Sequence, residues 1–184
     1  MGQRSEIYVA YETRDGKKIV ARYFGWNYGE RMISRITHTA GWLQNKVAHD
    51  YTVKTRDLIS IIETNFDFVD VQESADLVCY NNGMTSVNCF DDGNLNDGRG
   101  FLYVGHDGIK YCFTDNHNLV PLDCDGYMLF DTESCYPQYQ WINEEYKKSD
   151  RMKDCMENIK WLAENATVMT QEELDEFINA KYDV

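Results

Sequence analysis

The 184-residue chain contains 43% hydrophobic residues, including 13 Tyr, 8 Phe and 4 Trp. This is enough apolar material for a sizeable core, which excludes an intrinsically disordered chain. No stretch approaches the roughly 18 apolar residues that a membrane span needs. The start of the chain, Met1–Glu6, lacks the apolar region of a secretory signal, so we expect a cytoplasmic protein.

The formal net charge of −13 is unevenly distributed along the chain. Residues 1–66 carry ten Lys or Arg against seven Asp or Glu, residues 67–131 carry two against twelve, and residues 132–184 carry six against twelve. The acidic middle section repels nucleic-acid phosphates, so direct DNA or RNA binding is disfavoured outside the basic amino-terminal part.

Six cysteines lie between residues 79 and 155, and none forms a CxxC pair. In a chain of this length without a secretory signal, this pattern indicates reduced and mostly buried thiols. Metal sites are poorly supported, because no close pair of ligands is present for zinc and because Asp97 stands where a calcium loop starting at Asp92 needs Gly. We therefore expect neither a metal nor another cofactor. The candidate zinc ligands, which lack this close spacing, are Cys112, His117, Cys124 and Cys135.

The first third of the chain predicts a β-hairpin followed by two helices. Segments 7–11 and 18–24 are rich in β-branched and aromatic residues, and Arg14–Gly16 supplies the turn between them. Apolar residues then recur at three- and four-residue steps from about residue 30 to 48 and again from about 54 to 64. The predicted capping residues are Asn27 for the first helix and Thr52 or Thr55 for the second.

The remainder of the chain predicts short strands and then helices. Asn82-Gly83 and Asp107-Gly108 are typical of two-residue hairpin turns. The helical period returns at about Asp150, and Thr170 with Glu173 forms a capping box ahead of a last helix. The predicted strands are 68–71, 76–80, 85–90, 101–104, 109–113 and 127–130.

These elements predict an α+β fold in one domain, 1–184. Residues 1–66 form the hairpin and two helices, 67–131 form antiparallel strands, and 132–184 form a helical carboxyl-terminal part. We expect an antiparallel meander sheet, with the two amino-terminal helices packed on it and a carboxyl-terminal helical pair.

Several stretches resemble an uncharacterised family found in phages and prophages of Gram-positive bacteria. They are Met1–Tyr8, Ala21–Arg35, Gly108–Phe113 and Met169–Glu173, so the resemblance covers most of the chain. A more distant group has His-Trp-Asp-Gly-Tyr-Pro where this chain has Gly25–Gly29 (GWNYG), so no residue role is transferred from it. The resemblance implies an optional gene on a mobile element, where proteins that disarm host immunity are common, and it implies no particular activity.

A cluster of cations and aromatic residues surrounds the start of the first helix. Arg side chains and helix N–H groups there could bind a phosphate, with an aromatic ring stacked on a base. A strand-to-helix corner explains the same residues without a ligand, since Gly25 and Gly29 allow the turn and the aromatic rings pack. The candidate ligand-binding residues are Arg4, Arg22, Trp26, Tyr28, Arg31 and Arg35.

The acidic middle section is the largest functional signal. Its carboxylates fall mostly in or beside predicted turns, so they should face water. They could serve solubility alone, or they could form an array that imitates phosphates and complements a basic groove on a partner. The candidate partner-binding residues are Asp91, Asp92, Asp97, Asp107, Asp115, Asp123 and Asp125.

No motif identifies a reaction. The chain lacks a nucleophile elbow, a phosphate-binding loop and an HExxH sequence, and turn chemistry explains His106-Asp107. We therefore expect a non-enzymatic protein that binds and inhibits a host defence protein, such as a CRISPR nuclease, through an acidic surface. The alternative is a protein that binds or sequesters a nucleotide or another small phosphate compound at the cluster of cations and aromatic residues around the start of the first helix. We call this cluster the Arg/Trp corner.

Overall fold

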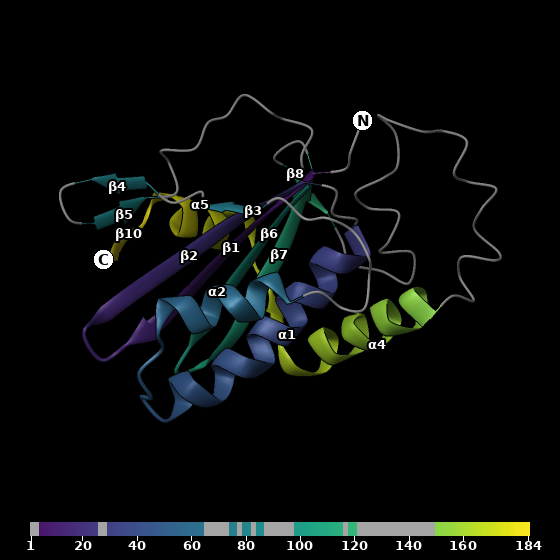
Figure 1. Cartoon of the computed structure of the whole chain (residues 1–184), viewed down its shortest axis with the longest axis horizontal. Coiled ribbons are helices and arrows are strands. Elements are labelled where there is room, and N and C mark those ends of the chain that lie inside the picture. The colour runs from purple at the N-terminus through teal and green to yellow at the C-terminus, as the bar shows by residue number, and fades with distance from the viewer. Residues whose placement is uncertain are drawn as a thin grey trace.

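The computed structural model describes residues 4–25, 29–64, 74–76, 79–81, 84–86, 98–115, 118–120 and 150–184. The fold is α+β, with helices on both faces of a large sheet (Figure 1). The helices are α1 Gly29–Ala48, α2 Thr55–Glu63, α4 Asp150–Asn165 and α5 Gln171–Asn179. The strands are β1 Arg4–Thr13, β2 Gly16–Gly25, β3 Ser74–Asp76, β4 Cys79–Asn81, β5 Met84–Ser86, β6 Gly98–Gly105, β7 Gly108–Asp115, β8 Asn118–Val120, β9 Thr167–Val168 and β10 Lys181–Asp183.

The large sheet is mixed, and the prediction of a purely antiparallel meander is wrong. Its strand order is β3-β2-β1-β6-β7-β8, with β9 paired to β7, and a second sheet has the order β10-β5-β4. The β1–β6 and β7–β9 pairs are parallel. A parallel pair needs a long crossover connection, and α1 and α2 lie in the segment that joins the β1–β2 hairpin to the later strands.

A buried ion pair joins the two central parallel strands. Glu6 of β1 and Arg99 of β6 are direct partners in the register, and Arg99 Nε lies 2.7 Å from Glu6 Oε2. The Glu6 side chain is only 1% exposed and also accepts a hydrogen bond of 2.8 Å from the Tyr8 hydroxyl. Breaking such a pair leaves an uncompensated buried charge, so this contact favours one register of β1 on β6.

Strand alternation divides the core between the two faces of the sheet. Ile7, Val9 and Tyr11 of β1 pack into a first core together with residues of α1, α2 and α4. Tyr8 and Ala10 point the other way and pack into a second core with α5 and β10. The predicted carboxyl-terminal helical pair is thus divided, because α4 packs with α1 on the first face and α5 covers the second. Figure 1 shows the molecule from the side of α1 and α2.

Most of the predicted local elements within the described part of the chain are confirmed. The β1–β2, β4–β5 and β6–β7 hairpins form, as do all four helices. The Thr170–Glu173 capping box is present at the start of α5. The predicted strand 76–80 is divided, since Asp76 pairs with β2 while Cys79 begins β4. The predicted strands 68–71 and 127–130 and the proposed cap Asn27 lie outside the described residues.

The cysteine prediction is confirmed for the two residues whose thiols the structure describes. Cys112 and Cys155 are buried and belong to no disulfide, and burial raises the pKa of the Cys112 thiol to about 12. Among the described helices, none is both long and apolar enough to cross a membrane.

Arg35 is the largest fully buried side chain among the described residues, and it joins α1 to the end of α2. Its Nη1 atom donates to the carbonyl oxygens of Ile62, at 2.6 Å, and Thr64, at 3.1 Å. Its guanidinium carbon lies 4.3 Å from the centre of the Phe24 ring. A cation at the carboxyl-terminal end of a helix also opposes the helix dipole. The start of α2 is less well satisfied, because its N-cap is Lys54, without a side-chain capping bond, and not Thr52 or Thr55.

Replacing Arg35 by Met should destabilise the fold by about 2–3 kcal/mol, because the buried carbonyl group of Ile62 and the partly buried one of Thr64 lose a charged donor. The matched control is Lys46→Met on the same helix, where the ammonium lies 4.6 Å from the Trp42 ring centre and is partly solvated. We expect that change to cost less than about 1 kcal/mol. Urea denaturation measures both, and equal losses would contradict the structural role of Arg35.

Candidate functional site

A row of polar side chains crosses four neighbouring strands at one end of the second sheet face. Lys17 of β2 lies opposite Glu12 of β1, and Lys110 of β7 lies opposite Tyr103 of β6. Strand alternation places them on the face that carries Ala10, Ile19, Phe101 and Cys112. Helix α5 and β10 cover the apolar part of this face, and the polar row borders a cleft beside them.

Glu12 is the most heavily bonded group in this row. Its Oε1 atom accepts from the Tyr103 hydroxyl at 2.5 Å, and its Oε2 atom accepts from the His106 backbone N–H at 2.7 Å. The Tyr103 bond, followed by the His106 backbone bond, lowers the pKa of Glu12 to about 2. Burial, followed by the bond to Glu12, raises the pKa of Tyr103. A Cβ atom at Gly105 would lie 3.1 Å from Glu12 Oε2 and 3.0 Å from the Tyr103 ring, so a larger residue there would require these side chains to shift by a few tenths of an ångström.

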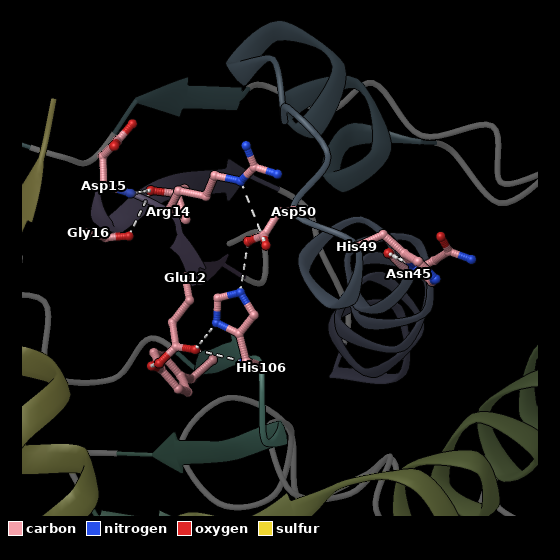
Figure 2. Close-up of polar contacts among 10 residues, drawn as sticks. Glu12, Arg14, Asp15, Gly16, Asn45, His49, Asp50 and His106 are labelled. Atoms are coloured by element: carbon pink, nitrogen blue, oxygen red, sulfur yellow. Dashed lines mark hydrogen bonds and ion pairs between the residues drawn. The ribbon is translucent and has the colours of Figure 1, made fainter.

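His106 lies between two carboxylates from distant parts of the chain (Figure 2). Its Nδ1 atom is 2.8 Å from Glu12 Oε2, and its Nε2 atom is 3.0 Å from Asp50 Oδ1. Both ring nitrogens can donate only when the imidazole is protonated. The bond to Asp50, followed by the bond to Glu12, accordingly raises the pKa of His106. The bridge connects the β6–β7 turn, the end of β1 and the loop after α1.

Asp50 has a backbone conformation that suits this bridge. Its φ angle of 52° lies in the left-handed region, which Asp tolerates better than most residues. Its carboxylate also lies 3.7 Å from Arg14 Nε in the β1–β2 turn. The hydrogen bond from His106 is the main cause that lowers the pKa of Asp50.

The cleft has a volume of about 590 Å³ and lies beside Glu12 and Tyr103. Its walls come from the β1–β2 and β6–β7 hairpins, the end of α4 with β9, and α5 with β10. Apolar side chains such as Met169 and Phe177 contribute to the lining, and Lys110 forms an ion pair with Glu173 across it. Its ionisable lining residues are Glu12, Lys17, Tyr103, Asp107, Lys110, Glu164, Glu173, Glu176 and Tyr182.

The pKa shifts in this cleft do not match general acid–base catalysis near neutral pH. A catalytic carboxyl or phenol works best with its pKa moved toward the working pH. Glu12 and Tyr103 are shifted away from neutrality in opposite directions. The arrangement therefore supplies fixed charges and hydrogen bonds, which suits binding. Within the described residues, no group of three or more potential metal ligands is found.

The predicted acidic residues do not all come together in the part of the chain that the structure describes. Asp107 is exposed in the β6–β7 turn and lines the cleft. Asp115 lies at the opposite end of β7, about 25 Å away for eight residues of strand. These two residues thus belong to one surface only if it extends along the whole strand. Asp91, Asp92, Asp97, Asp123 and Asp125 lie outside the described residues.

Two of the candidate cations of the Arg/Trp corner form contacts within the fold. Arg22 Nη2 lies 2.5 Å from Glu63 Oε1 at the end of α2. Arg35, the second of these cations, is fully buried against α2. Of Arg4 and Arg31 the structure describes the backbone only, in β1 and α1, and Trp26 and Tyr28 lie outside the described residues.

Sequence reasoning missed Glu12, Tyr103 and the partners of His106. One signal was available, because Glu12 follows Tyr8 and Ala10 at two-residue steps and so lies on an apolar strand face, where a charge is unusual. The contact of His106 with Asp50 had no such signal, since it depends on how α1 ends against the sheet.

Comparison with protein-family models, curated proteins and solved structures finds no match for this chain.

The His106 bridge should stabilise the protein in a defined pH window. Folding raises the pKa of His106, so its contribution is complete below its ordinary value of 6.5 and is lost as the pH rises through the raised pKa. Folding lowers the pKa of Glu12 to about 2, so its contribution is present above its ordinary value of 4.5 and is lost as the pH falls toward 2. The bridge is therefore strongest between about pH 4.5 and 6.5.

The difference in Tm between the unmodified protein and His106→Ala should accordingly be larger at pH 5.5 than at pH 8.5. Differential scanning calorimetry across this range measures it. The control is His49→Ala, which removes an exposed imidazole that contacts the Asn45 carbonyl oxygen. A difference that is constant with pH, or equal profiles for both variants, would rule out the bridge.

Proposed function

We propose that this protein is a non-enzymatic accessory protein of a phage or another mobile element. It binds a host defence protein and inhibits it by covering a basic, nucleic-acid-binding groove with an acidic surface. The resemblance to phage and prophage proteins and the charge distribution of the sequence motivate this proposal. The structural observation that carries it is the acidic helix α5 beside the cleft.

Helix α5 carries four carboxylates and no cation in nine residues. Glu172, Asp175 and Glu176 are exposed, and Glu173 is partly covered by its ion pair with Lys110. Asp107 adds a further carboxylate at the rim of the same cleft. Such a concentration of one charge sign speeds association with a basic partner and selects against acidic ones.

The alternative, a nucleotide or phosphate ligand at the Arg/Trp corner, has less support. Its cations Arg22 and Arg35 are engaged with Glu63 and with the end of α2. An enzymatic role at the cleft also has less support, because the pKa values of Glu12 and Tyr103 are moved away from neutrality. A binding protein with a fixed acidic surface accounts for both observations.

The proposal is tested on the partner captured by affinity purification from the native host and then purified. Neutralising the exposed face of α5 with Glu172→Gln, Asp175→Asn and Glu176→Gln should weaken binding about tenfold, since each exposed charge pair contributes roughly 0.5 kcal/mol. The matched control is Asp15→Asn, Asp57→Asn and Glu157→Gln, which changes the net charge equally at exposed sites elsewhere. We expect this control to stay within about twofold of the unmodified protein.

Isothermal titration calorimetry at increasing NaCl concentration measures both effects. Affinity should fall steeply with salt, because exposed charges are screened within about 10 Å at 0.1 M. Affinity that is indifferent to salt, or equal losses for the two triple variants, would refute the acidic-surface proposal.

A further inference from the structure

The charges that line the cleft fall into two groups. Glu12 is held by Tyr103 and His106, and Glu173 by Lys110. The second group, Asp107, Glu164 and Glu176, makes no ion pair with any residue in the described part of the chain. These three side chains are exposed at the cleft and come from the β6–β7 turn, the end of α4 and α5.

Two helices also direct their carboxyl-terminal ends toward this cleft. Glu164, Asn165 and Ala166 at the end of α4 line it, as does Ala180 just after α5. Neither helix has a basic residue in its last turn. The carboxyl-terminal end of a helix carries about half a negative charge, which stabilises a nearby cation. The backbone therefore adds to the negative potential of the side chains.

An ammonium group already lies against the aromatic wall. Lys17 Nζ is 5.1 Å from the centre of the Tyr103 ring, and both residues line the cleft. This is the distance range of a cation–π contact. The Tyr103 ring thus already contacts one cation, the Lys17 ammonium group. Lys17 occupies only part of the cleft, whose lining contains more carboxylates than ammonium groups.

The size of the cleft suits a long basic side chain. Its volume of about 590 Å³ falls within the range of roughly 300–1,000 Å³ that is typical of ligand-binding clefts. Ile109, Met169 and Phe177 provide apolar lining. Lys and Arg side chains pack their aliphatic stems on such surfaces while the charged end meets polar groups.

We infer that this cleft binds a Lys or Arg side chain presented by a basic segment of the partner protein. The inference rests on the proposed function and makes it specific, because it distinguishes a receptor site for one side chain from a diffuse acidic surface. The carboxylates of Asp107, Glu164 and Glu176 bind the cationic end, and the apolar lining contacts the stem. Lys17 limits the affinity as a like charge beside the Tyr103 ring.

The test uses the peptide Gly-Gly-Arg-Gly-Gly with both ends capped as a probe, and Gly-Gly-Gln-Gly-Gly as its neutral control. Titration followed by two-dimensional ¹H–¹⁵N NMR of the whole chain should show saturable shifts at the amides of residues 103–110, 164–169 and 176–182 with the Arg peptide only. Shifts spread evenly over exposed acidic residues, or no saturation, would overturn the inference.

Variants then separate the cleft from the general charge. Glu164→Gln with Glu176→Gln should weaken Arg-peptide binding by about fivefold, because two exposed charge partners are lost. Glu172→Gln with Asp175→Asn is the matched control, since both residues are exposed on α5 but do not line the cleft. Equal weakening by the two pairs would overturn the inference.

The variant Lys17→Ala tests whether the cleft binds a cation. Removing this exposed ammonium should strengthen Arg-peptide binding by about threefold, because the cleft loses a like charge and the Tyr103 ring becomes accessible. Weakened binding would show that the cleft does not take a cation. The peptide titration needs no host partner, so its failure leaves the salt-dependent partner binding to be judged separately.

Discussion

The parallel pairing of β1 with β6 is the constraint on which the rest of the structure depends. It places Glu6 beside Arg99 at one end of the pair and brings Glu12 to Tyr103 and His106 at the other. These partners are more than 90 residues apart in sequence. Both faces of β1 are covered, so its alternation sends Val9 to one core and Ala10 to the other. A shift of one residue in this register would exchange the two cores and separate Glu12 from its donors.

The charged residues of the sheet and its helices differ in function according to their surroundings. Arg35 and Glu6 are buried, and their charges are used within the fold to join α1 to α2 and β1 to β6. Glu12 is partly exposed, yet its bonds to Tyr103 and His106 fix its charge. Glu164 and Glu176 are exposed and form no ion pair within the part of the chain that the structure describes. Charges of this last kind are available to a partner at the lowest desolvation cost.

Local signals predicted local structure well. The Thr170–Glu173 box forms as expected, and so does the hairpin that Asp107-Gly108 indicated. The two turn residues of this hairpin are His106 and Asp107, however, and Gly108 begins β7. The mixed sheet could not be predicted in this way. The pairing of β1 with β6 depends on contacts between residues far apart in the sequence, and no turn residue indicates it. The same limit applies to Arg35, whose place four residues after Arg31 indicated a shared face but not that α2 would cover it.

The position of the carboxylates on α5 is the strongest physical reason to connect this helix with binding. Glu172 and Glu173 lie in its first turn, where negative charge opposes the helix dipole and stabilises the fold. Glu176 lies near the opposite end, where the dipole disfavours a carboxylate, and its electrostatic effect on Lys110 is smaller than that of Glu173. Helix stability therefore explains the first two acids but not Glu176. A cationic group bound in the cleft would compensate both this carboxylate and the negative ends of α4 and α5, whose last turns carry no basic residue.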